Sequence, residues 1–231
     1  MITRTKRRVV LVLKGSVAVF FLVCIWYSGW RAEVNPDFRG TSPPWRKIGE
    51  TRAAEQVFST SRLRLEKHTR VVDGLTIKDW LWLDFPDQVN ALVQSGPAGK
   101  FLLFNQTKYG LTGTSLAPIG GYVEPGETPL QAVAREILEE TGLDSCIFHD
   151  LGTFRVDVNR GCGSVSSFLA LGCRKSDLSA PSDDLERQKW VWLDEFELSR
   201  ALLDPWQSGF KEVKWSNTVA LGILKLHTLR E

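Results

Sequence analysis

Three glutamates stand close together in the chain, at a spacing that can bind a metal ion. Glu139 and Glu140 follow Glu136 by three and four residues, so a helix would bring the three side chains near one another. Two carboxylates about 4 Å apart repel by roughly 4 kcal/mol at an effective dielectric of 20. A hard divalent cation such as Mg²⁺ takes oxygen ligands, also holds substrate phosphates, and relieves this repulsion. The spacing therefore indicates metal-assisted chemistry, with an ordinary solvated acidic face as the alternative.

The residues around these glutamates predict the helix that must carry them. A Pro-Gly pair at 125–126 fits the centre of a type II turn. Thr128 then fits the N-cap, with proline at the first helical position and a capping-box glutamine at Gln131. Gly142 fits the left-handed residue just past a helix end. We therefore expect a helix over residues 129–141.

The predicted helix has an apolar side and an acidic side. At 100° per residue we expect the apolar residues to share one buried side, namely Leu130, Val133, Ala134, Ile137 and Leu138. We expect the three glutamates on the opposite side, with Arg135 at its margin.

Composition limits the class of protein. The chain has 231 residues and 43% hydrophobic content, which suffices for one sizeable core. A net charge of +2 is too balanced for a nucleic-acid surface, so no nucleic-acid partner is expected. The four cysteines include no Cys-x-x-Cys pair, which argues against a zinc site. Outside the N-terminal apolar segment, Cys146, Cys162 and Cys173 are expected as buried or free thiols with at most one disulfide.

The N-terminus resembles a membrane anchor. Basic residues at positions 4 and 6–8 precede an apolar run over 9–30 that only Lys14 interrupts. Such a run can span a bilayer core of about 30 Å. Trp26, Tyr27 and Trp30 fit an aromatic belt at its far end. We interpret residues 1–31 as an uncleaved transmembrane signal anchor, 32–54 as a linker, and 55–231 as the catalytic domain.

This topology leaves the N-terminus cytosolic and puts the domain in a lumen or outside the cell. A cleavable signal peptide fits less well, because no small-x-small pair follows the run cleanly. A mitochondrial presequence is the third reading, since the start is basic and free of acidic residues. Mitochondrial and secreted locations are therefore the alternatives to a single-pass membrane protein.

The remaining pattern predicts a mixed α/β sandwich. Asp73-Gly74 fits a hairpin turn, and Asp194 opens a helix. Strands are expected at 58–72, 78–85, 88–94, 101–106, 115–123, 146–158, 165–171 and 190–193, with a closing helix at 217–229.

The segment 121–143 resembles the Nudix box, Gly-x5-Glu-x7-Arg-Glu-U-x-Glu-Glu-x-Gly-U, where U is apolar. Every fixed position of the box is met. The resemblance implies a Nudix hydrolase with an α/β/α sandwich around a mixed sheet. Such enzymes cleave a nucleoside diphosphate linked to another moiety, using water and Mg²⁺ or Mn²⁺.

The resemblance also implies roles for the residues of the box. Glu136 and Glu140 match the main metal ligands, Glu139 a further ligand or the water-activating base, and the carbonyl of Gly120 completes one metal site. The remaining fixed residues have structural roles in the motif: Gly121, Glu127, Arg135 and Gly142. In the ADP-ribose pyrophosphatase group of this family, which the flanks resemble, the catalytic base often comes from a later loop, for which Glu186 is the candidate here, backed by Asp184. A plain solvated acidic loop is the alternative for 182–186.

The flanks are similar to the ADP-ribose pyrophosphatase group of nucleotide-sugar hydrolases. The resemblance covers about residues 55–228 and implies a homodimer in which the N-terminal strands cross over. Lys108 stands where this group usually has an arginine that binds the substrate diphosphate, and a lysine is a point charge rather than a planar fork. ADP-ribose or a related nucleotide sugar is the favoured substrate. Dinucleoside polyphosphates, coenzymes, capped nucleotides and a non-catalytic nucleotide-binding module stay as alternatives.

Overall fold

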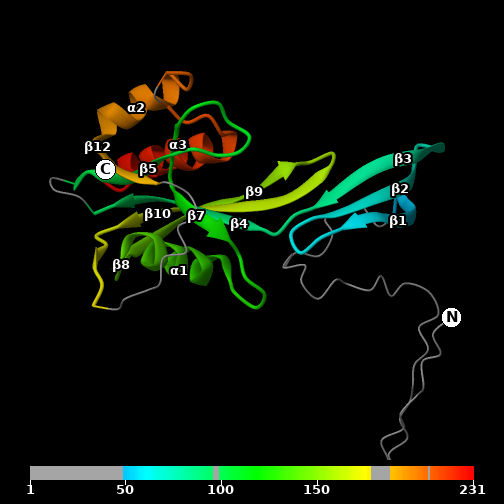
Figure 1. The fold of residues 1–231 in the computed structure, drawn as a ribbon, viewed down its shortest axis with the longest axis horizontal. Helices are drawn as coiled ribbons and strands as arrows, with labels where there is room; N and C mark the ends of the chain where they lie inside the picture. The colour runs from blue at the N-terminus through cyan, green and yellow to red at the C-terminus, as the bar shows by residue number, and fades with distance from the viewer. Residues whose placement is uncertain (1–48, 96–98, 178–187, 208) are drawn as a thin grey trace, which may run out of the picture. The chain divides into compact units, whose positions relative to one another are not determined.

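A mixed sheet of ten strands dominates the computed structural model, which describes residues 49–95, 99–177, 188–207 and 209–231 (Figure 1). The predicted membrane anchor at 1–31 lies outside the described residues. Among the residues that are described, no helix is both long and apolar enough to cross a membrane.

The sheet has the strand order β1-β2-β3-β10-β4-β5-β12. Three further strands join it at the sides: β6 pairs with β5, β7 with β4, and β9 with β10. Strand β10 runs parallel to β3 and β4, whereas the other pairs are antiparallel. The bounds are β1 (Thr51–Ser59), β2 (Arg64–Val72), β3 (Leu75–Asp84), β4 (Gln88–Gln94), β5 (Phe101–Gln106), β6 (Ser115–Ala117), β7 (Ile119–Tyr122), β9 (Ile147–Asp157), β10 (Gly161–Leu171) and β12 (Lys189–Leu193). A separate small sheet pairs β8 (Leu143–Asp144) with β11 (Arg174–Lys175).

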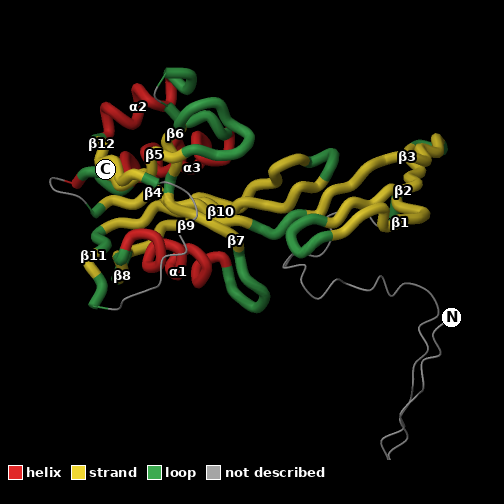
Figure 2. The backbone as a smooth tube through the Cα atoms, viewed as in Figure 1, coloured by secondary structure: helices red, strands yellow, loops and turns green. Residues whose placement is uncertain are grey.

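Helices cover both faces of this sheet (Figure 2). Helix α1 (Pro129–Thr141) lies on one face, where Val133 and Ile137 join a buried cluster with residues such as Phe104. Helices α2 (Glu195–Leu203) and α3 (Val213–Thr228) lie on the other, where Leu198 and Val219 join a second cluster. The predicted mixed α/β architecture is confirmed.

Several predicted strand limits need correction. The strand expected at 58–72 is two strands, β1 and β2, and β1 begins at Thr51, inside the expected linker. The strand expected at 115–123 divides at Pro118, which has no backbone N–H to continue a ladder. Helix α3 begins at Val213, four residues before the expected start at 217. The Asp73-Gly74 turn is confirmed, with φ of 49° and 80°.

Helix α1 has the limits and caps that the sequence predicts. The Thr128 hydroxyl accepts from the Gln131 backbone N–H at 3.3 Å, and the Gln131 side chain accepts from the Thr128 N–H at 2.9 Å. Gly142 takes the left-handed conformation, with φ 64°. Local chemistry alone therefore fixes where this helix starts and stops.

The buried side of α1 differs from the prediction. Its buried residues are Ala132, Val133, Ile137 and Thr141, whereas Ala134 is exposed and Leu130 is 49% exposed. Glu140 follows Val133 by seven residues, nearly two full turns, so it faces the sheet rather than the opposite side. The expectation that all three glutamates share the face opposite the core is wrong for this residue.

One disulfide links the segments that follow α1 and β10. Cys146 and Cys173 are bonded, whereas Cys162 is a free thiol. The backbone N–H of Ser176, close to Cys173, donates to the carbonyl of Gly142 at 2.8 Å. The disulfide therefore lies beside the C-terminal end of α1, and the expectation of at most one disulfide holds for the described cysteines.

Candidate active site

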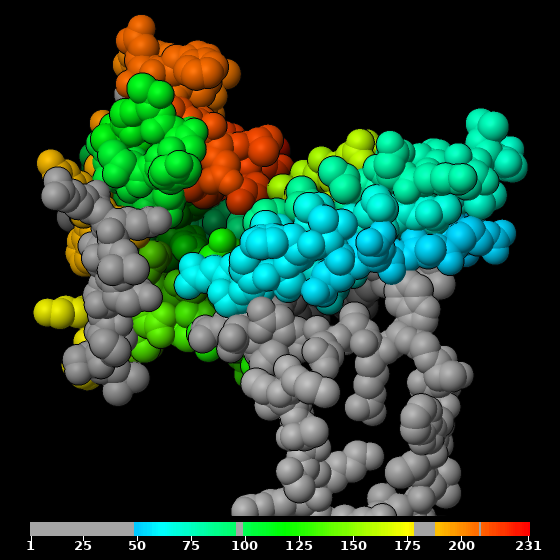
Figure 3. Space-filling model, turned by 45° about the vertical axis from the view of Figure 1, so that its right-hand side comes forward, coloured from blue at the N-terminus to red at the C-terminus, as the bar shows by residue number. Residues whose placement is uncertain are grey.

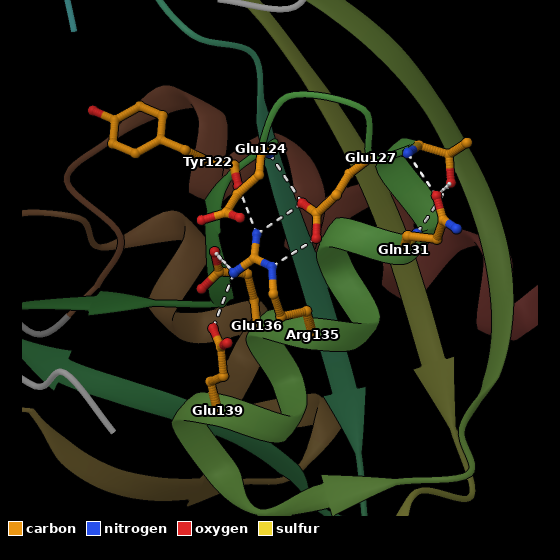
Figure 4. A network of polar contacts seen from close by, with 8 residues as sticks. Tyr122, Glu124, Glu127, Gln131, Arg135, Glu136 and Glu139 are labelled. Atoms are coloured by element: carbon orange, nitrogen blue, oxygen red, sulfur yellow. Dashed lines mark hydrogen bonds and ion pairs between the residues drawn. The ribbon is translucent and has the colours of Figure 1, made fainter. Parts of the chain in front are cut away.

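Arg135 is the centre of a polar network between the loop before α1 and the helix itself (Figure 4). Its Nε donates to Glu127 Oε1 at 2.8 Å and its Nη2 to Glu127 Oε2 at 3.0 Å, so the two groups form a bidentate pair. Nη2 also donates to the Tyr122 carbonyl at 2.9 Å. This hydrogen bonding lowers the pKa of Glu127 and raises that of Arg135. The guanidinium thus ties the loop to the helix.

The same guanidinium also holds two of the three candidate metal ligands. Arg135 Nη1 donates to Glu136 Oε1 at 2.8 Å and to Glu139 Oε2 at 2.9 Å. The Glu136 side chain is only 14% exposed, whereas that of Glu139 is 36% exposed. Glu127, Glu136 and Glu139 therefore share one positive charge, which only partly offsets their repulsion, and a metal ion would compete with Arg135 for Glu136 and Glu139.

Two glycines of β7 make room for this arrangement. A Cβ atom on Gly121 would lie 2.2 Å from Glu136 Oε1. A Cβ atom on Gly120 would lie 2.2 Å from the carbonyl oxygen of Val89. Both distances are far below van der Waals contact, so no larger residue fits at either position without movement.

Glu140 is separate from the Arg135 network. Burial, with a smaller effect from the charge of Glu136, raises the pKa of the Glu140 carboxyl to about 8. Three groups oppose this rise: a hydrogen bond from the Gln188 side chain, one from the Gly120 backbone, and the charge of Lys108. Gly120 of β7, Gln188 before β12 and Lys108 of the loop after β5 therefore all act on the Glu140 carboxyl.

Two buried oxygen atoms test whether these residues fit a divalent cation. Among the described residues, the buried side-chain oxygens without a hydrogen-bond partner are Glu140 Oε2 and Gln106 Oε1. Phe104 and Leu102 of β5 pack in the cluster beneath α1, and strand alternation puts Gln106 on the same face. Buried acceptors without donors are costly, and oxygen-binding cations are suited to satisfy them. The donor chemistry fits a divalent cation.

The carboxylates are not already arranged around a metal, however. No three Asp, Glu, His or Cys side chains in the described part of the chain are grouped closely enough to hold an ion. Arg135 engages Glu136 and Glu139, while Glu140 is directed to the sheet. The site therefore has suitable donors that would need to rearrange around a cation.

Comparison with known proteins identifies the family. The NUDIX domain profile matches residues 84–213, more than half of the 231-residue chain. The chain belongs to the Nudix family. It is a Nudix hydrolase.

A solved structure supports the same fold. The chain is similar to a crystal structure described as an ADP compounds hydrolase, with a TM-score of 0.65 and 17% sequence identity. The similarity covers 78% of this chain and 94% of that one. No curated protein sequence matches the chain.

The described part of this Nudix domain adds Gln188 to the candidate site and does not include the two candidate loop residues. Glu186, the candidate loop base, lies outside the described residues, as does Asp184. Gln188, which no sequence motif marks, is described and contacts Glu140. Its spacing of two and four residues from Trp190 and Trp192 is the sequence signal that places it on the face of α1.

A cavity of about 420 Å³ lies elsewhere, between α2 and β12. Its lining includes Leu116 and Ala201, which belong to the buried cluster on the α2 and α3 face of the sheet. It contains none of the predicted site residues, so the Nudix box and not this cavity defines the candidate active site.

Proposed function

We propose that this Nudix hydrolase cleaves the pyrophosphate bond of a nucleoside diphosphate linked to another moiety, in a reaction that depends on Mg²⁺ or Mn²⁺. The observation that carries the proposal is Glu140, a box carboxylate whose Oε2 is buried without a donor and whose ionised form the charge of Lys108 favours. ADP-ribose or a related nucleotide sugar is the favoured substrate. The activity on ADP compounds of a protein with this fold supports that choice.

The box residues would divide the work between metal binding and proton transfer. Glu136, Glu139, Glu140 and the carbonyl of Gly120 would hold the cation, which neutralises charge developing on the phosphate oxygens. Glu139 is the most solvent-accessible of the Arg135-bound carboxylates, so it is suited to accept a proton from the attacking water. Glu186 is the second candidate base, and Lys108 would attract the substrate diphosphate.

Product release from full-length protein tests this function. With Mg²⁺ and ADP-ribose, we expect AMP and ribose phosphate, and we expect Glu140→Gln to reduce the rate by at least about 100-fold. Glu55→Gln changes an exposed glutamate of β1 in the same way and should keep wild-type activity. Equal rates for wild type and Glu140→Gln, or no hydrolysis by either, would contradict the proposal.

A substrate panel then tests the favoured class. Diadenosine polyphosphates, coenzymes and capped nucleotides contain the same type of bond as nucleotide sugars. We expect the highest kcat/KM for ADP-ribose or a nucleotide sugar. Binding of these ligands without any product would instead indicate a non-catalytic nucleotide-binding module.

We further propose that residues 1–31 anchor the protein in a membrane with the domain on the lumenal or outer side. The basic flank before the apolar run supports this orientation. The Cys146–Cys173 disulfide supports it too, because disulfides persist in oxidising compartments. Extraction of membranes with alkaline carbonate is the test, and release of the full-length chain into the supernatant would contradict it.

A homodimer is the proposed assembly. In Figure 3 the strands β1–β3, in cyan and teal, form much of the surface that faces the viewer. These strands expose the apolar side chains Val57, Phe58, Leu75 and Leu81. Contiguous exposed apolar patches mark protein contacts, and we propose that these side chains contribute to one. Light scattering on detergent-solubilised protein tests the proposal, and a monomer at micromolar concentration would contradict it.

A further inference from the structure

Glu140 is held between two strands that come from distant parts of the sequence. Its carboxylate accepts hydrogen bonds from the backbone of Gly120 in β7 and from the side chain of Gln188, just before β12. Its Oε2 atom has no hydrogen-bond partner among the described residues. Residues of two separate segments thus bond this carboxylate, while its Oε2 stays available for a ligand.

The position of Gln188 follows from the pairing of β12 with β5. Lys189 pairs with Asn105 and Trp192 with Leu102. Trp192 packs against the cluster beneath α1. Because side chains alternate along a strand, Gln188 faces α1 together with Trp192, whereas Lys189 faces the other way. A strand end, rather than a mobile surface side chain, therefore presents the amide to Glu140.

The chemistry of the partner matters for a metal ligand. Arg135 holds Glu136 and Glu139 with a full positive charge, which competes with a metal ion for the same oxygens. An amide donates hydrogen bonds without a charge, so it orients a carboxylate without opposing a nearby cation. Outer groups of this kind orient carboxylate ligands, and their loss typically costs about 10- to 100-fold in metal affinity or activity.

We propose that Gln188 is a positioning residue for the Nudix hydrolase: it orients the Glu140 carboxylate so that Oε2 is presented to the catalytic cation. The expected effect of Gln188 on activity rests on the proposed function. Its effect on cation affinity does not, because that affinity can be measured without any substrate.

Calorimetric titration of the full-length, metal-free protein with Mn²⁺ is the central experiment. Gln188→Met keeps the length of the side chain and removes its donors, so we expect the Kd for Mn²⁺ to rise about 10- to 100-fold. Lys189→Met, the adjacent change on the opposite face of β12, should leave the Kd within about twofold. Gln188→Ala gives a second test if the methionine variant does not fold, as judged by circular dichroism.

A double mutant distinguishes positioning from a general loss of structure. If Gln188 acts through Glu140, adding Gln188→Met to Glu140→Gln should not weaken Mn²⁺ binding further. In activity assays, Gln188→Met should raise the Mn²⁺ concentration for half-maximal rate, and kcat at saturating Mn²⁺ should recover to within a few-fold of wild type.

Several outcomes would overturn the proposal. They are a wild-type Kd in the Gln188 variants, an equal loss in Lys189→Met, additive losses in the double mutant, or no Mn²⁺ binding by the wild type. Wild-type protein that binds Mn²⁺ but hydrolyses no pyrophosphate substrate would refute the proposed function alone. The Kd comparison would still decide the role of Gln188.

Discussion

Arg135 links three glutamates of the box and so combines a structural and an electrostatic task. It fixes the loop through Glu127, and it partly offsets the charge of Glu136 and Glu139. Only a planar group with several donors can serve partners in these different directions. A lysine has the same charge but not the same geometry.

We therefore expect Arg135→Lys to destabilise the domain even though the charge is kept. The variant loses the bidentate pair with Glu127, and the free energy of unfolding should fall by about 1–3 kcal/mol. Urea denaturation of the metal-free protein measures it. Arg174→Lys, on the exposed strand β11, should have no comparable effect. An unchanged midpoint for Arg135→Lys would show that the network contributes no stability.

The raised pKa of Glu140 predicts an unusual pH dependence in the metal-free protein. A folded-state pKa of about 8 against an ordinary 4.5 means that folding favours the protonated carboxyl. Its contribution to stability is therefore full below about pH 4.5 and is lost as the pH rises towards 8. The loss is on the order of 3 kcal/mol between about pH 5 and 8.

Comparison with Glu140→Gln isolates this contribution, because the amide does not titrate. Thermal unfolding across this pH range should show the wild type losing stability relative to the variant as the pH rises. Saturating Mg²⁺ should protect the wild type at pH 8, since the cation favours the carboxylate. A constant difference between the two proteins at every pH would refute the assignment.

At the scale of elements, the sequence predicts features set by neighbouring residues, such as helix ends. It does not predict features that depend on how strands pair and helices pack. Thr128, Gln131 and Gly142 determine the ends of α1 through contacts within a few residues, so those ends are predictable. Which side of α1 is buried depends on the sheet beneath it, and the pattern wrongly predicts burial of Leu130 because an apolar residue can also face solvent. The sequence pattern does not single out Gln188, because only the register of β12 on β5 brings it to Glu140.

The contact between β7 and α1 gives an element-scale prediction. In Gly121→Ala the new Cβ would lie 2.2 Å from Glu136 Oε1. The flexible carboxylate can move aside, so the fold should survive while Mn²⁺ affinity falls by about 10-fold or more. Gly49→Ala, where the new Cβ meets nothing within 4 Å, is the matched control in the same calorimetric titration. Wild-type affinity in Gly121→Ala would show that the position of Glu136 is not critical.

The disulfide between the segments after α1 and β10 gives a second prediction at the scale of elements. Cys146 and Cys173 are 27 residues apart, and closing a loop of this length stabilises a domain by about 3–4 kcal/mol in the chain-entropy model. Reduction, or Cys146→Ser, should lower the melting temperature by several degrees. Cys162→Ser should not, because that thiol is free. Identical melting curves with and without reductant would exclude a stabilising bond.

At the scale of the whole molecule, the strands of the large sheet are not joined by equally long ladders of paired residues. Seven residue pairs join β10 to β4, whereas a single pair, Gly161 with Leu83, joins β10 to β3. A few bonds from the β9–β10 turn reinforce that junction, including the one from Trp80 Nε1 to the Asn159 carbonyl at 2.9 Å. The strands β1–β3 form long hairpins with each other but have this narrow connection to the rest of the sheet.

This narrow junction has a consequence for the order in which the domain opens. Backbone amides exchange with deuterated solvent only when their bonds break, and weakly connected segments open at lower free energy. In protein diluted below the concentration at which the proposed dimer forms, the amides of β2 and β3 should gain deuterium together and earlier than those of β4 and β10. Mass spectrometry of peptic fragments would follow this order, and uptake at one common rate would mean that the junction is no weaker than the centre of the sheet.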